Sequence, residues 1–193
     1  MGRTRTFLAI DINKPVRASV TKVQEDLAEL GADVKWVEPA NLHLTMLFLG
    51  EVDDRDLVAI CRAATKVAAD IKQFSMVLEG VGAFPNTRRP RTLWVGVNEG
   101  KDSVIALHKA LENALFDLGC YRREARAFAP HLTLGRVNSA RNEESLVTAI
   151  SENADRICGE TNVSEVLVMG SELKSSGPEY TVIGRAKLTG KAK

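Results

Sequence analysis

The sequence predicts an α+β fold of two similar lobes of antiparallel sheet, with helices outside and a cleft between the lobes. The first observation is a repeated tetrapeptide, because His43-Leu44-Thr45-Met46 has a near copy in His131-Leu132-Thr133-Leu134. The second is the mixed alternation of predicted strands and helices without a dinucleotide-binding glycine fingerprint, which favours antiparallel sheets over a doubly wound fold. The third is size: 193 residues of 45% hydrophobic composition can bury a full core. We therefore expect residues 1–193 to form a single domain made of two interleaved lobes.

Hydrophobic periodicity and turn residues place the elements along the chain. Strands are expected at 7–12, 36–49, 74–78, 92–97, 165–173 and 180–188, and over the second histidine motif. Helices are expected at 16–30, 53–71, 103–118 and 142–157. In the first helix, Val20, Val23 and Leu27 form an apolar stripe that begins after Pro15 and ends at Gly31.

The two histidine motifs are better suited to strands than to helices. Successive side chains of a strand alternate between the two faces, so His43 and Thr45 share one face while leucine and methionine occupy the other. The second copy repeats this arrangement with His131 and Thr133. Each motif therefore presents an imidazole and a hydroxyl side by side, and two lobes would place one such pair on each side of a cleft.

Two opposed imidazoles are suited to acid and base catalysis near neutral pH, because the ordinary histidine pKa is about 6.5. In-line phosphoryl displacement requires one group to accept a proton from the entering oxygen and another to protonate the departing oxygen. A threonine hydroxyl beside each histidine could donate to a non-bridging phosphate oxygen. Neither motif has a carboxylate or thiol on its histidine face, so we expect no metal and no cofactor.

Composition excludes several other classes of function. The formal net charge is +1, which argues against a broad surface for duplex nucleic acid but not against a short RNA end. The longest apolar runs are too short for a membrane span, so no membrane association is expected. Cys61, Cys120 and Cys158 lack metal-ligand spacing, and we interpret them as buried thiols of a cytoplasmic protein.

The motifs and their flanks closely resemble the 2H phosphoesterases, and within them the LigT-like RNA 2′,3′-cyclic phosphodiesterases, historically called 2′-5′ RNA ligases. The resemblance runs from Arg5 to about Leu188. It includes the segment from Trp36 to Gly50, the segment from Gly82 to Trp94 and the ending from Ser171 to Tyr180. One His-x-Thr motif is weak evidence, whereas two with these flanks are specific.

The resemblance implies a bilobal, pseudo-twofold fold whose two motifs line a central cleft. It implies metal-independent hydrolysis of an RNA terminal 2′,3′-cyclic phosphate to a 2′-phosphate, with weak reverse 2′-5′ ligation. His43 would be the proton donor and His131 the proton acceptor, although near symmetry leaves the reverse order open. The partner would be such an RNA end or a cyclic nucleotide, and we expect a monomer without an obligate protein partner.

The family pattern also assigns phosphate binding to Thr45, Thr133 and Arg136. Strict strand alternation would put Arg136 on the far face from His131, unless Gly135 hosts a β-bulge that turns the next side chain back. The first motif has Leu47 and Phe48 at the equivalent positions, so a bulge is less expected there and Phe48 is predicted to lie in the core.

Two other functions remain open at this point. The same cleft could bind a nucleotide or an RNA end without turnover, although both histidines and both threonines are present. Alternatively, the enzyme could act on other cyclic nucleotides, on 2′-5′ oligonucleotides or in trimming RNA ends.

Overall fold

The computed structural model describes residues 2–123, 126–175 and 177–190. Within them nine strands form one sheet in the order β7-β4-β5-β6-β3-β1-β8-β9, with β2 paired to β6. Every pairing in the sheet is antiparallel. The predicted α+β class with antiparallel sheet is confirmed. The strands are β1 (Arg3–Ile10), β2 (Val34–Trp36), β3 (Leu44–Asp53), β4 (Phe74–Phe84), β5 (Thr92–Val97), β6 (His131–Val137), β7 (Ile157–Val163), β8 (Glu165–Lys174) and β9 (Gly177–Lys187).

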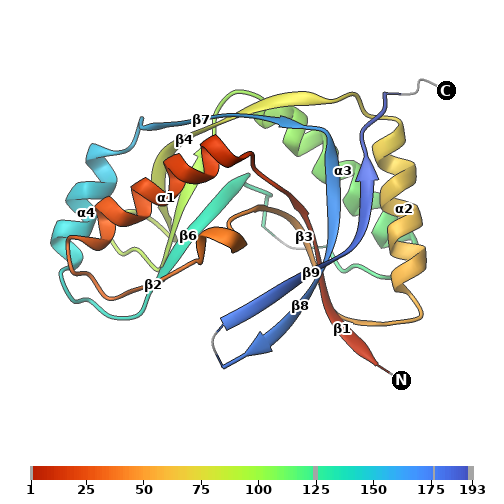
Figure 1. The fold of residues 1–193 in the computed structure, drawn as a ribbon, viewed down its shortest axis with the longest axis horizontal. Coiled ribbons are helices and arrows are strands. Elements are labelled where there is room, and N and C mark those ends of the chain that lie inside the picture. Colours follow the sequence, from red (N-terminus) through yellow and green to blue (C-terminus); the bar gives the residue numbers. More distant parts are fainter. Residues whose placement is uncertain (1, 124–125, 176, 191–193) are drawn as a thin grey trace.

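Four α-helices and a short 3-10 helix accompany this sheet in the described part of the chain. They are α1 (Lys14–Ala28), α2 (Leu57–Ala69), α3 (Lys101–Asp117), α4 (Glu143–Glu152) and the 3-10 helix η1 (Pro39–Asn41). Figure 1 shows α1 and α4 at one end of the molecule and α2 at the other, with α3 near α2. None of the described helices is long and apolar enough to cross a bilayer.

The first helix illustrates how the sequence sets an element. The Asn13 side chain accepts a hydrogen bond from the Val16 amide at 2.9 Å, which caps the helix, and Pro15 occupies its first turn. Val16, Val20, Val23 and Leu27 recur at helical spacing and are at most 2% exposed. The helix therefore buries one stripe, although it ends two residues before the predicted Leu30.

The two halves of the sheet meet at the histidine motifs. We call β3-β1-β8-β9 the first lobe and β6-β5-β4-β7, with β2, the second lobe. The β3–β6 pairing sets Leu44 opposite Leu132, and both side chains are fully buried. The middle of each motif is thus anchored in the core on the same face of the sheet.

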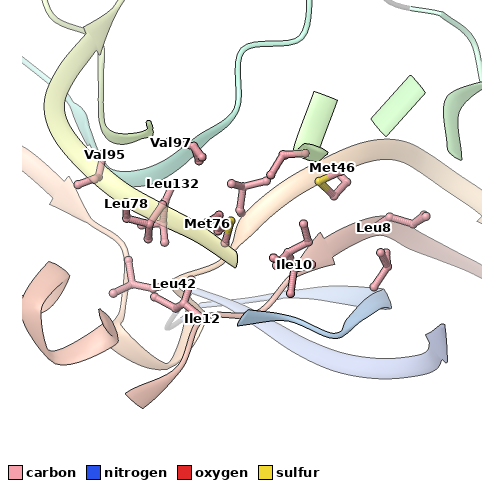
Figure 2. Close-up of a cluster of buried hydrophobic side chains, with 14 of the residues drawn as sticks. Leu8, Ile10, Ile12, Leu42, Met46, Met76, Leu78, Val95, Val97 and Leu132 are labelled. Atoms are coloured by element: carbon pink, nitrogen blue, oxygen red, sulfur yellow. The ribbon is translucent and has the colours of Figure 1, made fainter. Parts of the chain in front are cut away.

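The core lies behind these motifs. Figure 2 shows side chains from both lobes in one cluster, among them Leu8 and Ile10 from β1, Met76 from β4 and Val95 from β5. Because these side chains occupy the alternate positions of their strands, the other face of each strand is left for the cleft.

Several boundaries and side-chain environments differ from the predictions. The helix expected at 142–157 ends at Glu152, and a short turn then leads into strand β7, which was not predicted. The segment 36–49 is divided among β2, η1 and β3 rather than one strand. Of the three cysteines, which are free, Cys158 is buried as expected, whereas Cys61 and Cys120 are only half-buried.

Candidate active site

His43 lies one residue before β3, between η1 and the strand. Its Nδ1 lies 2.6 Å from the Asn41 carbonyl oxygen, and its Nε2 lies 2.9 Å from the Thr45 hydroxyl. A carbonyl oxygen only accepts hydrogen bonds, so Nδ1 carries the proton in the neutral ring. Nε2 is therefore the nitrogen that exchanges a proton, and it faces the hydroxyl two residues further along the chain.

The ring of His43 is held between two aromatic side chains. Phe7 stacks on it with ring centroids 5.0 Å apart, and Tyr180 meets it edge-on at 5.4 Å. Burial lowers the pKa of His43; the Asn41 carbonyl and the Asp11 carboxylate act in the opposite direction, and the Arg17 guanidinium adds to the lowering. Burial therefore favours the neutral form of the His43 ring.

His131 is the first residue of β6 and repeats this arrangement in the second lobe. Its Nδ1 lies 2.7 Å from the Ala129 carbonyl oxygen, so Nε2 is again the nitrogen that exchanges a proton. Phe84 meets the ring edge-on at 4.9 Å, and the centroid of Trp94 lies 6.3 Å away. Burial lowers the pKa of His131, and the Ala129 carbonyl partly offsets the effect.

The strand register relates the two motifs to each other. The antiparallel pairing of Leu44 with Leu132 brings the two motifs together where the lobes meet. Both leucines are fully buried, so the alternate positions, His43 and Thr45 in one motif and His131 and Thr133 in the other, face away from the core.

Four of the five predicted site residues line one cavity of about 290 Å³: His43, Thr45, Thr133 and Arg136. His131 does not line this cavity. His131 lies two residues before Thr133 on β6. It borders a separate depression of about 300 Å³ that Phe84 and Trp94 also line.

The bulge expected at Gly135 is present. The β5 partners of β6 pass from Gly135 directly to Thr133 and skip Leu134, so Leu134 and Gly135 both point into the protein. Arg136 then returns to the cleft face. A Cβ on Gly135 would lie 2.7 Å from Val34 Cγ1 and 3.0 Å from Trp36 Cε3, so β2 leaves no room for a side chain there.

The prediction that Phe48 lies in the core was wrong. The β1 partners of β3 skip Met46 in the same way, so Met46 and Leu47 are both buried at 2% exposure. Phe48 is consequently turned outward, is 55% exposed and lines the cavity with Thr45. The expectation failed because it assumed uninterrupted alternation where no glycine marks a bulge.

Two further basic residues, which the sequence did not predict, approach the site from other elements. Lys35 of β2 lines the cavity and pairs in register with Arg136, which brings a second cation to the site. Arg17 of α1 donates to the Pro39 and Leu42 carbonyls at 2.6 and 2.9 Å and to the Asp11 carboxylate at 2.5 Å, which ties η1 to α1 just before His43. Lys35 and Arg17 are far in sequence from the residues that they contact, so no local sequence pattern indicates either role.

Comparison with known proteins agrees with this geometry. The family model described as LigT like Phosphoesterase matches twice, at residues 10–94 and 95–180. A relative from Methanothermobacter thermautotrophicus, named RNA 2′,3′-cyclic phosphodiesterase, is 36% identical over 93% of this chain and 96% of its own length. A relative of the same name from Archaeoglobus fulgidus is 35% identical over 91% and 96%. The chain belongs to the LigT-like phosphoesterase family.

Solved structures show the same fold. TT0787 of Thermus thermophilus superposes with a TM-score of 0.80 at 28% identity, over 97% of this chain and all of that one. LigT of Escherichia coli complexed with 3′-AMP gives a TM-score of 0.76 at 25% identity, over 97% and 99%.

Proposed function

We propose that this protein hydrolyses the terminal 2′,3′-cyclic phosphate of an RNA, or of a cyclic nucleotide, to a 2′-phosphate without a metal. The observation that carries the proposal is the matched pair of histidines on one cleft face. In each, a backbone carbonyl fixes Nδ1 and leaves Nε2 to transfer a proton. The names of the relatives support the choice of a cyclic phosphodiester as substrate.

In the proposed reaction, His131 is the general base and His43 the general acid. His131 Nε2 accepts a proton as a water oxygen forms a bond to phosphorus. The bond from phosphorus to the 3′ oxygen breaks on the opposite side, and His43 Nε2 delivers its proton to that oxygen. The products are a 2′-phosphate and a 3′-hydroxyl, and transfer of a proton through solvent from His131 to His43 restores the starting state.

The other cavity residues serve the phosphate in this proposal. The hydroxyls of Thr45 and Thr133 donate to the non-bridging oxygens, and the Arg136 guanidinium balances their negative charge as it builds up. The negative charge of a bound phosphate raises the pKa of His43 toward the protonated form that the acid role requires. A 5′-hydroxyl of a second RNA in place of water would give a 2′-5′ linkage by the same proton transfers.

We propose that the protein acts as a monomer without an obligate protein partner. The described residues contain no cluster of three or more His, Cys, Asp and Glu side chains that could hold a metal ion. The proposed chemistry uses only proton donors, proton acceptors and cations of the chain.

Incubation with adenosine 2′,3′-cyclic phosphate in excess EDTA, followed by chromatographic separation of 2′-AMP from 3′-AMP, tests the proposal. We expect 2′-AMP alone, and no product from a His43→Ala/His131→Ala double variant prepared in parallel. Formation of 3′-AMP would contradict the assigned geometry. Binding without turnover would instead make the cleft a nucleotide-binding module.

A further inference from the structure

Lys35 and Arg136 place two positive charges side by side at the cavity. The two residues lie directly opposite each other in the β2–β6 pairing, and both are exposed and line the cavity. Cβ atoms at such positions are about 5 Å apart, and like charges there destabilise the sheet. Within the described residues neither side chain forms an ion pair. An anion that lies against the two side chains would relieve this repulsion.

The proposed reaction leaves Lys35 without a role. A cyclic phosphate carries a single negative charge, and in the proposed reaction Thr45, Thr133 and Arg136 already contact it. The carboxylate of Glu38 also lines the cavity, but it forms no ion pair with Lys35. Lys35 therefore remains available for a second anionic group of the same ligand.

The charges beside the cavity indicate which way that ligand extends. A depression of about 760 Å³ shares Asn41, His43 and Tyr180 with the cavity and offers the other path away from it. Its two arginines are both neutralised, since Arg17 pairs with Asp11 and Arg185 with Glu165. A phosphate entering this depression would meet no free arginine, so the path past Lys35 is favoured for a polyanion.

We propose that Lys35 binds the 3′–5′ phosphodiester that joins the terminal nucleotide to the rest of the RNA, while Arg136 and the two threonines hold the cyclic phosphate. The inference rests on the proposed function and deepens it, because it makes an RNA end, rather than a free cyclic nucleotide, the preferred substrate. A lysine ammonium is a compact charge on a flexible stem, and a contact to a backbone phosphate reads no base. The subsite therefore accepts any sequence before the terminal nucleotide.

The test compares two dinucleotides of adenosine that end in a 2′,3′-cyclic phosphate and differ only in the linkage. In one the 3′–5′ linkage is a phosphodiester, in the other an uncharged methylphosphonate, and both carry a 2′-O-methyl group on the first adenosine. The wild type should show a kcat/KM about 10-fold higher for the phosphodiester, the size of one hydrogen bond to a charged group. Equal values in the wild type would overturn the proposal.

Lys35→Met keeps the length of the side chain and removes its charge. It should lower kcat/KM for the phosphodiester about 10-fold and leave the methylphosphonate within about twofold, whereas Lys35→Arg should keep the preference. Lys109→Met is the matched control, because Lys109 is an exposed lysine of α3 that does not line the cavity, and it should change neither value. Equal losses on both dinucleotides in Lys35→Met would assign Lys35 to the cyclic phosphate or to the sheet. No loss on either would show that no phosphate contacts Lys35, and either result overturns the proposal.

Salt dependence gives a readout that a purely structural role of Lys35 would not change. Each phosphate contact with a single strand contributes about 0.7 to the slope of log affinity against log salt concentration. The slope of log kcat/KM for the phosphodiester should therefore be shallower by about 0.7 in Lys35→Met than in the wild type. An unchanged slope would contradict the contact.

A binding measurement separates this proposal from the proposed function. If the wild type turns over neither dinucleotide, the proposed function fails, and titration of both can be followed by tryptophan fluorescence, since Trp36 lines the cavity. The subsite predicts that the wild type binds the phosphodiester about 10-fold more tightly than the methylphosphonate and that Lys35→Met loses this preference. Equal preference in the two proteins would refute the subsite whether or not the cleft is catalytic.

Discussion

Substitution of Gly135 by alanine should lower both the stability and the activity of the protein, because Gly135 lies in the β-bulge of β6. The added Cβ would lie 2.7 Å from Val34 Cγ1, 3.0 Å from the Lys35 carbonyl oxygen and 3.0 Å from the ring of Trp36. Only the first of these atoms is the end of a side chain, so β2 must move away from β6. Overpacking of this kind costs about 1–3 kcal/mol. Because Arg136 is the next residue, its guanidinium should also shift out of the cavity.

Urea unfolding of Gly135→Ala should therefore show a lower midpoint at an unchanged slope, and steady-state kinetics should show at least about a tenfold loss in kcat/KM from the displaced cation. Gly170→Ala is the matched control, since its Cβ would lie 3.1 Å from Ile183 Cδ1 and 3.2 Å from Thr4 Cγ2, both ends of side chains that can move. Arg136→Ala should lower activity without lowering stability. Wild-type stability and rate in Gly135→Ala would refute the role assigned to the bulge.

Other predictions concern proton transfer and the support of His43. His43→Ala and His131→Ala should each reduce kcat about 10²- to 10⁴-fold with an unchanged circular dichroism spectrum, and activity within about tenfold of wild type in either would contradict the acid and base assignment. Burial lowers the pKa of both histidines, and turnover needs one neutral and one protonated ring. A plot of kcat/KM against pH should therefore be bell-shaped, with its maximum below the ordinary histidine pKa of about 6.5. A maximum well above pH 7 would show that other groups set the profile. Arg17→Ala should lower kcat, because it releases η1. Loss of the positive charge of Arg17 should also raise the pKa of His43 and move the pH profile of kcat/KM to higher pH. A lower rate with an unchanged pH profile would leave Arg17 a structural role only.

Much of the fold could be predicted because local patterns agree with the tertiary structure. The stripe of α1 and the alternation within the histidine motifs depend on spacing that the sequence displays directly. Strand β7 was missed because its buried residues, Cys158, Thr161 and Val163, are not regularly spaced at every second position and one of them is polar. The predicted helix over 142–157 also extended over the start of this strand.

Part of the candidate site could be predicted because the sequence contains the same motif twice. The repeat makes the two His-x-Thr motifs recognisable, and Gly135 marks the bulge that returns Arg136 to the cleft. Phe48 was misplaced because Met46 and Leu47 give no sign of a bulge, since both are residues that a regular strand accepts. Lys35 and Arg17 reach the site through pairing and helix packing, which depend on the assembled fold.

In the proposed reaction, this cleft opens a 2′,3′-cyclic phosphate by proton transfer to one histidine and from the other. Phosphorus NMR of a short RNA ending in such a phosphate, followed in excess EDTA with the wild type and with His131→Ala, tests it most directly. We predict that the wild type converts the cyclic resonance to that of a 2′-phosphate alone, and that the variant leaves it essentially unchanged over the same time. Persistence of the cyclic phosphate with the wild-type protein, or equal conversion by the variant, would contradict the claim.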